Sequence, residues 1–300
     1  MVPSGKPCEE LNMRVGYYPG CSLGSTAKEF DLSFRAICKG YGIDLVDIPD
    51  WNCCGASPAH QLNEELAFAL PYRNLLKAEE GKLNTVVSPC PACYSHLLNT
   101  HKKVVERHVL DERLTEMVGG SYQKSVDSKH LVDFLYRDIG VERIHESVKN
   151  PLDGLRVACY YGCLTRLPGV DIDDAENPTM MDAISSAIGA EPLEWSHKTE
   201  CCGASLSITR TDIGLRLANE ILEAAQGVKA DCIAVVCPLC QSNLDMRQAD
   251  VGKKYGRLYN LPLIYLTQLI GLALGMGSED LGLDRLVVDP APLLRTKGFL

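Results

Sequence analysis

The residues best suited to chemistry in this sequence are ten cysteines arranged as two sets of five. Each set has one cysteine, then an adjacent pair followed by glycine, then a Cys-Pro-x-Cys element. The first set is Cys21, Cys53, Cys54, Cys90 and Cys93, and the second is Cys163, Cys201, Cys202, Cys237 and Cys240. Thiolates bind zinc, copper(I) or iron–sulfur clusters, and a Cys-x-x-Cys pair can also act as a redox dithiol.

Several kinds of site are compatible with clustered cysteines, and the spacing favours one of them. A structural zinc ion takes four ligands, so five thiolates overfill it. Adjacent side chains on an extended backbone diverge, which suits a larger group whose separate metal atoms are reached from one stretch of chain. A thioredoxin-like dithiol needs one motif only, and disulfide scaffolds are usually short secreted chains. The pattern therefore favours iron–sulfur clusters, with zinc, a dithiol and disulfides as alternatives.

The two sets belong to an internal repeat. Asn52-Cys-Cys-Gly-Ala-Ser57 recurs as Glu200-Cys-Cys-Gly-Ala-Ser205, and the strand-like run before Cys90 recurs before Cys237. Equivalent cysteines lie 142, 148 and 147 residues apart. A shift of about 145 residues thus maps one half onto the other, with small differences that loops can absorb.

Strand and helix patterns alternate in the same order in both halves. Strands are predicted at residues 13–18, 44–48, 85–88, 155–160, 192–195 and 232–236. Helices are predicted from an N-cap at Ser25 to Gly40, at 64–79, after Cys93, at 177–189 and at 212–225. This alternation predicts an α/β fold of two duplicated domains related by pseudo-symmetry, each a small, mostly parallel sheet flanked by helices.

The elements also predict where the cysteines meet. Parallel sheets place sites at the carboxyl ends of their strands, where Cys21, Cys90, Cys163 and Cys237 fall. Helix N-termini after Cys90 and Cys237 favour thiolates and an anionic cluster, and a proline fits the first turn of each helix. Gly55 and Gly203 are expected where the backbone approaches closely or takes a positive φ.

The expected organisation is a tail, two domains and an extension. The boundaries are residues 1–12, 13–150, 151–281 and 282–300. The polar stretch 111–129 and the segment 148–155 are expected to connect the repeats. The run Asp289-Pro-Ala-Pro-Leu-Leu294 is expected to be extended and to pack on a partner.

Other residues near the cysteines are secondary candidates. His60, His96 and His197 are candidate proton donors, as are Tyr17, Tyr18, Tyr160 and Tyr161. The favoured alternatives are surface or already hydrogen-bonded histidines, and tyrosines that pack at strand ends. Cys38 and Cys232 lie in apolar patterns and are expected in the core, and Cys8 lies in the N-terminal tail. Cys159 is an alternative ligand to Cys163.

Composition narrows the class of protein. The formal charge is −9 and the sequence pI is about 5.3, which argues against nucleic acid and anionic membranes as partners. The first twelve residues lack the apolar run of a secretory signal, and the apolar stretch 261–276 is shorter than the ~20 residues of a membrane span. A cytoplasmic protein without a membrane span is expected.

The repeated Cys-xₙ-Cys-Cys-Gly-xₙ-Cys-x-x-Cys pattern resembles the cysteine-rich CCG domain. Two copies in one chain resemble the B subunit of heterodisulfide reductase and its bacterial relatives, with the likeness running from Val15 to about Gly275. The resemblance implies a non-cubane 4Fe–4S cluster on each set of five cysteines, and no flavin in this chain.

The resemblance also implies a function. Members of that family cleave or form disulfides, or carry out related thiol chemistry, with electrons from two partners: a ferredoxin-like iron–sulfur protein (the C subunit) and a flavin protein (the A subunit). A catalytic role on a small disulfide, thiol or lipoate-type carrier is the leading hypothesis. An electron-relay role in a larger reductase or sulfur-oxidising complex is the alternative, and a zinc-stabilised scaffold is the second alternative.

Overall fold

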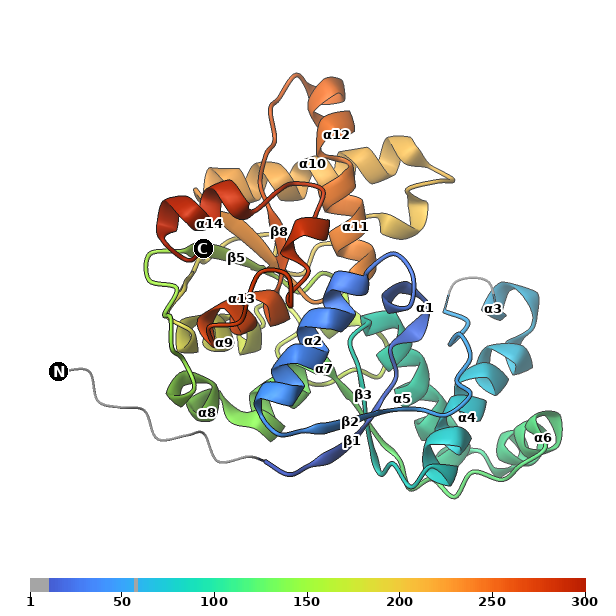
Figure 1. Ribbon diagram of the computed structural model, residues 1–300. Helices are drawn as coiled ribbons and strands as arrows, with labels where there is room; N and C mark the ends of the chain where they lie inside the picture. Colours follow the sequence, from blue (N-terminus) through green and yellow to red (C-terminus); the bar gives the residue numbers. More distant parts are fainter. Residues whose placement is uncertain (1–10, 57–58) are drawn as a thin grey trace.

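The computed structural model describes residues 11–56 and 59–300, and its two halves follow one α/β plan (Figure 1). Each half contains a sheet of four parallel strands, in the orders β2-β1-β3-β4 and β6-β5-β7-β8. Helices flank both sheets. The predicted fold class, two duplicated domains with small parallel sheets, is confirmed.

The elements of the first half alternate as the sequence predicts. They are β1 (Arg14–Tyr17), α1 (Gly20–Leu23), α2 (Lys28–Gly40), β2 (Asp44–Asp47), α3 (Ala59–Leu62), α4 (Glu64–Glu80), β3 (Thr85–Ser88), α5 (Pro91–Glu106), α6 (His108–Val118), β4 (Asp127–His130), α7 (Leu131–Asp133), the π-helix η1 (Phe134–Gly140) and α8 (Val141–Glu146).

The second half repeats this order with short 3₁₀ turns added. Its elements are β5 (Arg156–Tyr160), η2 (Leu164–Arg166), α9 (Met180–Ala187), β6 (Glu191–Pro192), η3 (Ala204–Leu206), α10 (Thr211–Gly227), β7 (Cys232–Val235), α11 (Pro238–Met246), α12 (Gln248–Tyr255), β8 (Leu263–Tyr265), α13 (Leu266–Ala273), η4 (Leu283–Arg285) and α14 (Ala291–Lys297).

Three local predictions are wrong. Ser25 does not cap a helix: α2 begins at Lys28, and the Ser25 hydroxyl donates to the Cys21 carbonyl at 2.7 Å. The polar stretch expected to link the repeats contains α6 and β4. It was missed because β4 is an edge strand of sequence Asp-Ser-Lys-His, in which polar side chains hide the alternation that marks a strand.

The C-terminal run is also not extended. It forms α14, because proline fits the first turn of a helix. Leu294 is fully buried in the core of this chain, and the Lys297 ammonium contacts the Asp231 carboxylate at 2.9 Å. The extension therefore packs on the second half of its own chain.

The strand order fixes where a site can form. In each sheet the two central strands precede the single cysteine and the Cys-Pro-x-Cys element: β1 and β3 in the first half, β5 and β7 in the second. The chain leaves the two central strands toward opposite edges of the sheet, which opens a crevice at their carboxyl ends. Both Cys21 and Cys90 follow these ends, and their counterparts do the same.

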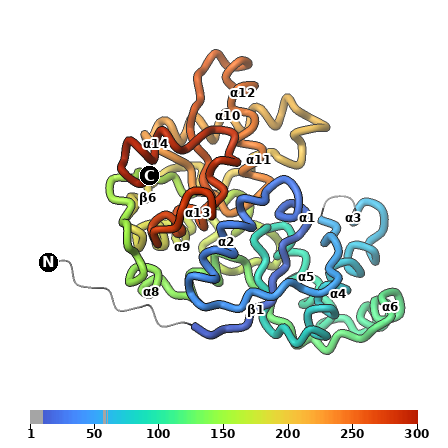
Figure 2. Tube along the Cα trace, in the orientation of Figure 1, coloured from blue at the N-terminus to red at the C-terminus, as the bar shows by residue number. Residues whose placement is uncertain are grey.

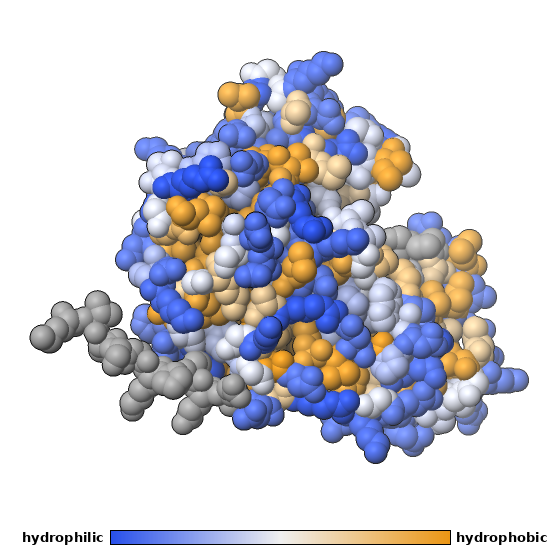
Figure 3. All heavy atoms as spheres, viewed as in Figure 1, coloured by the Kyte–Doolittle hydropathy of each residue, from blue (hydrophilic) through white to orange (hydrophobic). Residues whose placement is uncertain are grey.

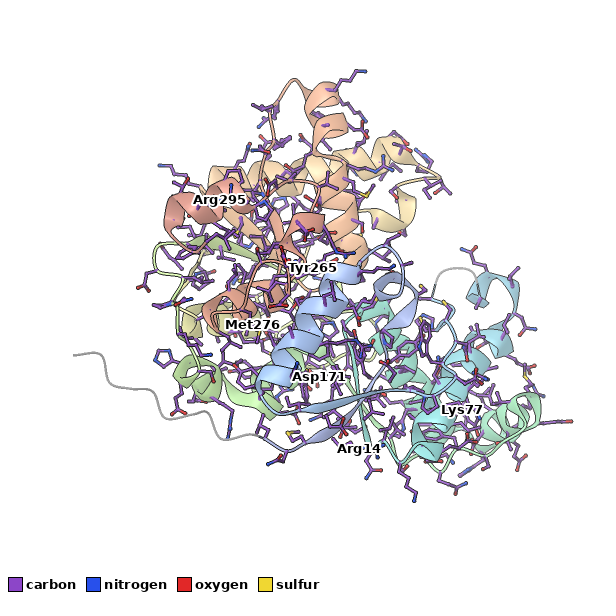
Figure 4. All side chains as sticks on the ribbon, viewed as in Figure 1. Arg14, Lys77, Asp171, Tyr265, Met276 and Arg295 are labelled. Carbon is purple, nitrogen blue, oxygen red and sulfur yellow. The ribbon has the colours of Figure 1, made fainter. Side chains whose placement is uncertain are left out.

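The two halves share one hydrophobic core. Phe30 of α2 stacks on Tyr265 at the end of β8 with ring centroids 4.1 Å apart. The hydroxyls of Ser33 and Thr267 are hydrogen-bonded at 2.7 Å beside them. Figure 4 shows Tyr265 and Met276 lying along α2. A second, smaller cluster that includes Tyr72 and Leu97 fills the space under α4 and α5 in the first half alone.

The short helix α1 lies between the halves. It carries Cys21 and contacts α11, the helix that carries Cys240 (Figure 2). The two cysteine-bearing regions are therefore neighbours in the fold.

Candidate functional site

The five cysteines of the first set come from three segments that meet at the carboxyl end of the first sheet. Cys21 lies in α1 just after β1, and Cys53 and Cys54 lie in the loop after β2. Cys90 follows β3 as the N-cap of α5, and Cys93 sits in the first turn of that helix. We call these residues the first quintet, and the equivalent five residues of the other half the second quintet.

Sulfur contacts link the members of the first quintet. The Sγ atoms of Cys54 and Cys93 are 3.4 Å apart. Cys93 also interacts with Cys90, and Cys53 interacts with both Cys54 and Cys21. The five thiols thus form a continuous chain of contacts, in the order 21, 53, 54, 93 and 90.

The second quintet contains the equivalent sulfur pair. The Sγ atoms of Cys202 and Cys240 are 3.3 Å apart, and Cys240 also interacts with Cys237. Cys163 lies within electrostatic range of Cys201, Cys202 and Cys237. Every cysteine that the structure describes is a free thiol, so neither quintet is joined by disulfides.

One hydrogen-bonded sulfur pair in each quintet has the same effect on the pKa values of its two thiols. The hydrogen bond between the Cys54 and Cys93 thiols lowers the pKa of Cys54 to about 7. The bond between the Cys202 and Cys240 thiols also lowers the pKa of Cys202. The pKa values of Cys93 and Cys240 are raised, chiefly by the same hydrogen bonds. The pKa of Cys90 is lowered as well, chiefly by its hydrogen bond with Cys93, so the surroundings of Cys54, Cys90 and Cys202 favour the thiolate form.

Glycines let the backbone approach the sulfur atoms. Gly55 and Gly203 have φ values of +75° and +76°, which confirms the predicted positive φ. Gly20 and Gly162 were not singled out from the sequence. A Cβ on Gly20 would lie 3.0 Å from the Cys93 Sγ, and one on Gly162 would lie 3.3 Å from the Cys240 Sγ. The sequence feature that could have identified these two glycines is their position directly before the first cysteine of each set.

Tyrosine hydroxyls form hydrogen bonds with the backbone of the cysteine loops. The Tyr18 hydroxyl donates to the Asn52 carbonyl at 2.7 Å, and the Tyr160 hydroxyl donates to the Glu200 carbonyl at 2.6 Å. These carbonyls directly precede Cys53 and Cys201. Tyr17 and Tyr161 donate to Asp31 and Asp182 instead. All four tyrosines are buried, so they pack at strand ends as one reading of the sequence expects.

The candidate histidines occupy different settings. His96 lines a cavity beside the first quintet, and the His197 Nδ1 is 2.8 Å from the Ser196 hydroxyl. His60 lies in α3, and its side chain is outside the described part of the structure. Their role as proton donors stays a prediction.

The remaining cysteines lie apart from the quintets. Cys38 and Cys232 are fully buried in the hydrophobic core, as predicted. Cys159 is buried too and contacts the Ser185 hydroxyl at 3.5 Å, so Cys163 and not Cys159 lies with the second quintet. Cys8 lies outside the described residues.

One loop has a support that the sequence reading missed. Asn74, fully buried in α4, accepts from the Asn52 amide at 2.9 Å and donates to the Asn52 carbonyl at 2.8 Å. The clue was a single asparagine within the apolar face of a helix. The second half has Ile221 at the equivalent position of α10.

Fold and site together define a duplicated α/β protein with two converging cysteine quintets, and comparison with known proteins places it in a family. The model described as CCG, cysteine-rich domain, matches residues 15–98 and 157–245. The chain belongs to the CCG cysteine-rich domain family.

Full-length relatives carry names of reductase subunits. The 8-methylmenaquinol:fumarate reductase membrane anchor subunit of Wolinella succinogenes is 33% identical, covering 94% of this chain and 100% of the relative. The B subunit of the ferredoxin:CoB-CoM heterodisulfide reductase of Methanosarcina mazei is 28% identical, covering 91% and 93%. In residues 11–56 and 59–300, no helix has the length and apolar character required to cross a membrane.

A solved structure has the same fold. A hypothetical protein from Helicobacter pylori superposes with a TM-score of 0.76 at 14% identity, covering 92% of this chain. This chain spans about half (52%) of that longer protein. At this identity the likeness shows the fold alone.

Proposed function

We propose that this chain is the iron–sulfur catalytic subunit of a heterodisulfide reductase-like complex. The observation that carries the proposal is the convergence of five free thiols at the carboxyl end of each sheet, with sulfur pairs 3.4 and 3.3 Å apart. In the described residues, no three His, Cys, Asp or Glu side chains are placed to hold one metal ion. A chain of sulfur contacts suits several iron atoms better than one ion at a single point.

The residues present fit a non-cubane 4Fe–4S cluster in each quintet. The donors are all sulfur, and Gly20 and Gly162 clear the space beside them. Backbone N–H groups of Ala92 and Cys93 donate to Cys90 at the N-terminus of α5, which favours negative charge there. When bound, such clusters supply electrons one at a time.

The proposed reaction is the cleavage or formation of a small disulfide. Cleavage consumes two electrons and two protons and yields two thiols. The electrons come from partner iron–sulfur and flavin subunits, and this chain holds no flavin. His60, His96 and His197 are the candidate proton donors. A lipoate-type carrier offers the same disulfide chemistry as a free organic disulfide. The name of the Methanosarcina mazei relative supports this assignment.

One observation favours a second candidate function. The Wolinella succinogenes relative matches over its whole length, and its name is that of a fumarate reductase subunit. We therefore keep the electron-relay role as the alternative: the same two quintets would pass electrons within a larger reductase, and this chain would perform no disulfide chemistry.

Iron analysis of selected variants tests the proposal. Anaerobically purified protein is expected to hold about eight irons with matching acid-labile sulfide, since each cluster has about four. Cys54→Ser and Cys202→Ser should each remove about four irons. Cys38→Ser, which alters a buried cysteine outside the quintets, should remove none. Zinc without sulfide would instead support the scaffold alternative.

Turnover separates the two redox candidates. Reduced, fully loaded protein should cleave an organic disulfide when a reduced dye supplies electrons. If oxidised, fully loaded protein takes up electrons from the dye in proportion to its clusters, yet the reduced protein returns no thiol from any disulfide offered, the relay role holds and the catalytic role fails.

A further inference from the structure

The connection that follows the first cysteine differs between the two halves. In the first half α2 begins at Lys28, seven residues after Cys21. In the second half α9 begins at Met180, seventeen residues after Cys163. The second repeat therefore has a longer connection here than the first. We call residues 167–172, which lie within it, the strap.

The strap is bound to the first half through its backbone. Three first-half side chains donate hydrogen bonds to strap carbonyls: Asn99 to Pro168 at 2.7 Å, Lys102 to Gly169 at 2.7 Å and Arg137 to Ile172 at 2.9 Å. Asn99 and Lys102 are three residues apart on α5 and so lie on one face of that helix. Two of the donors are cations, whose hydrogen bonds are stronger than neutral ones. A segment that begins near the second quintet is thus held by the helix that carries two cysteines of the first.

The strap forms part of the wall of a cavity beside the first quintet. This cavity has a volume of about 430 Å³, and its lining includes Leu167 and Pro168 of the strap. It also includes Ala92, which directly precedes Cys93. A cavity of about 360 Å³ beside the second quintet is lined, within the described part of the chain, by second-half residues alone. The wall that comes from the other half therefore distinguishes the first site from the second.

Buried residues anchor the strap at its end and just before its start. Ile172 is 6% exposed and belongs to the core, and Leu164, ahead of the strap, is fully buried. Between these anchors Pro168, Gly169 and Asp171 are exposed. A segment with few buried apolar contacts opens at a lower free energy than the core does. The middle of the strap can therefore move while its anchors stay in place.

The other junction between the halves is of a different kind. There Phe30 of α2 stacks on Tyr265, which directly precedes α13. On the face seen in Figure 3, hydrophobic residues form small groups among hydrophilic ones, some of them along α2 and α13. Because that junction is apolar and the strap is held by polar groups, the strap can open without separation of the halves.

Gly169 allows the strap to lie close to α5. Its φ is +74°, and a Cβ there would overlap the Asn99 side-chain amide. A left-handed backbone and a close approach both require glycine at this point. The strap is therefore fitted to α5 in the closed position.

We propose that the strap is a gate over the cavity beside the first quintet, with Asn99 and Lys102 as its latch. In the closed position it limits the access of small molecules to the first quintet. Opening breaks the two latch hydrogen bonds and leaves Leu164 and Ile172 buried. This inference rests on the proposed function, because the gated site is a cluster-binding quintet, and it adds the control of access to that site.

Hydrogen exchange of the strap amides tests the latch. Lys102→Met removes the donor to Gly169, and we expect the strap amides of the iron-loaded chain to exchange about tenfold faster. Gly169→Ala, whose Cβ would displace the strap from Asn99, should do the same. Lys77→Met is the matched control: the Lys77 ammonium contacts Glu80 at 2.6 Å on α4 of the same half. Its replacement should leave strap exchange unchanged.

Iron release to a chelator tests the gate. In Lys102→Met and Gly169→Ala, about half of the iron should leave about tenfold faster, and the remainder at the wild-type rate. A Cys202→Ser chain is expected to hold iron in the first quintet alone. Lys102→Met added to that chain should accelerate the release of all of its iron. In Lys77→Met the release should match that of wild-type protein.

Results obtained at normal iron content concern the gate alone. Unchanged strap exchange in both variants would overturn the latch, and faster exchange with wild-type iron release would overturn the gate. Acceleration that is absent in the Cys202→Ser chain would also overturn it, because the strap would then act through Cys163 on the second quintet. Protein purified anaerobically without iron and sulfide fails the proposed function, and this is recognised before any strap variant is made.

Discussion

The Tyr160 hydroxyl donates a hydrogen bond of 2.6 Å to the carbonyl oxygen of Glu200. Tyr160 ends a central strand of the second sheet, and Glu200 directly precedes Cys201. This bond joins the loop that carries Cys163 to the loop that carries the adjacent cysteine pair. Tyr18 and Asn52 repeat it in the first half at 2.7 Å. The bond is therefore part of the frame that brings each quintet together.

Removal of this hydroxyl should loosen the second quintet. Tyr160→Phe keeps the ring and its packing but leaves the Glu200 carbonyl without its donor. We expect a loss of about 1 kcal/mol in the free energy of unfolding. We also expect a chelator to remove iron from the second quintet of Tyr160→Phe severalfold faster than from the second quintet of wild-type protein. The decay of visible absorbance follows this loss.

The matched control is Tyr259→Phe. The Tyr259 hydroxyl donates to the Asn219 Oδ1 at 2.9 Å, away from both quintets. That variant should lose similar stability and release iron at the wild-type rate. Equal release rates in Tyr160→Phe and Tyr259→Phe would show that the Tyr160 bond has no special part in the site.

Glycine at position 162 should be required for the second quintet. Its φ is +59°, and an added Cβ would lie 3.3 Å from the Cys240 Sγ. Gly162→Ala should cost about 1–2 kcal/mol of backbone strain and also displace that sulfur. We expect about half the iron of wild-type protein, measured after anaerobic purification.

Gly154→Ala separates the two effects of that substitution. Gly154 has φ +76°, and a Cβ there meets nothing within 4 Å. It therefore imposes the same kind of backbone strain without touching a sulfur. If Gly154→Ala loses as much iron as Gly162→Ala, strain alone explains the loss and the close approach of Gly162 does not matter.

The sequence was most informative where a pattern repeats and is strongly apolar. The sequence predicts the strand Thr85–Ser88 with its observed bounds, because a short apolar run lies there between turn residues. The structure buries Val86 and Val87 of this run. The convergence of the five cysteines in each half follows from the rule that parallel sheets place sites at the carboxyl ends of their strands. Both predictions depend on local residue types and on a two-fold repeat, which a single sequence contains.

Features that depend on tertiary packing could not be predicted. The strand β4 is polar, and only its pairing with β3 reveals it. The helix α14 is stabilised by Leu294 in the core and by Lys297 on Asp231, contacts between residues distant in the sequence. The bonds from Asn99 and Lys102 to the strap are likewise a property of packing, and no residue pattern signals their acceptors.

The shared core predicts that the two halves unfold together. Phe30 is fully buried and stacks on Tyr265 of the other half. Phe30→Ala should lower the free energy of unfolding by about 3–5 kcal/mol and shift one common transition, measured by tryptophan fluorescence in urea. Trp51 and Trp195 report on the first and second half respectively.

Leu32→Ala on the same helix is the control for that experiment. Leu32 is 38% exposed, so its truncation should cost far less. Two separate transitions, with only the first shifted by Phe30→Ala, would contradict a common core.

A buried histidine holds the loop that leads to Cys90. The His130 Nδ1 accepts from the Val132 amide at 3.2 Å, so its Nε2 carries the proton and donates to the Pro89 carbonyl at 3.0 Å. Burial lowers the pKa of His130 from 6.5 to about 3. The folded protein therefore keeps this ring neutral at pH values where the unfolded chain protonates it.

His130 should make stability depend on pH between about 5 and 7. Because the unfolded state binds the extra proton, stability is highest above pH 6.5 and falls by about 2 kcal/mol from pH 7 to pH 5. His130→Gln retains a donor for Pro89, and its side chain does not titrate in this range. The difference in the free energy of unfolding between pH 7 and pH 5, measured by urea unfolding, should therefore be about 2 kcal/mol smaller in this variant than in wild-type protein. The exposed His108→Gln should keep it. A pH dependence in His130→Gln as steep as in wild-type protein would exclude His130 as its source.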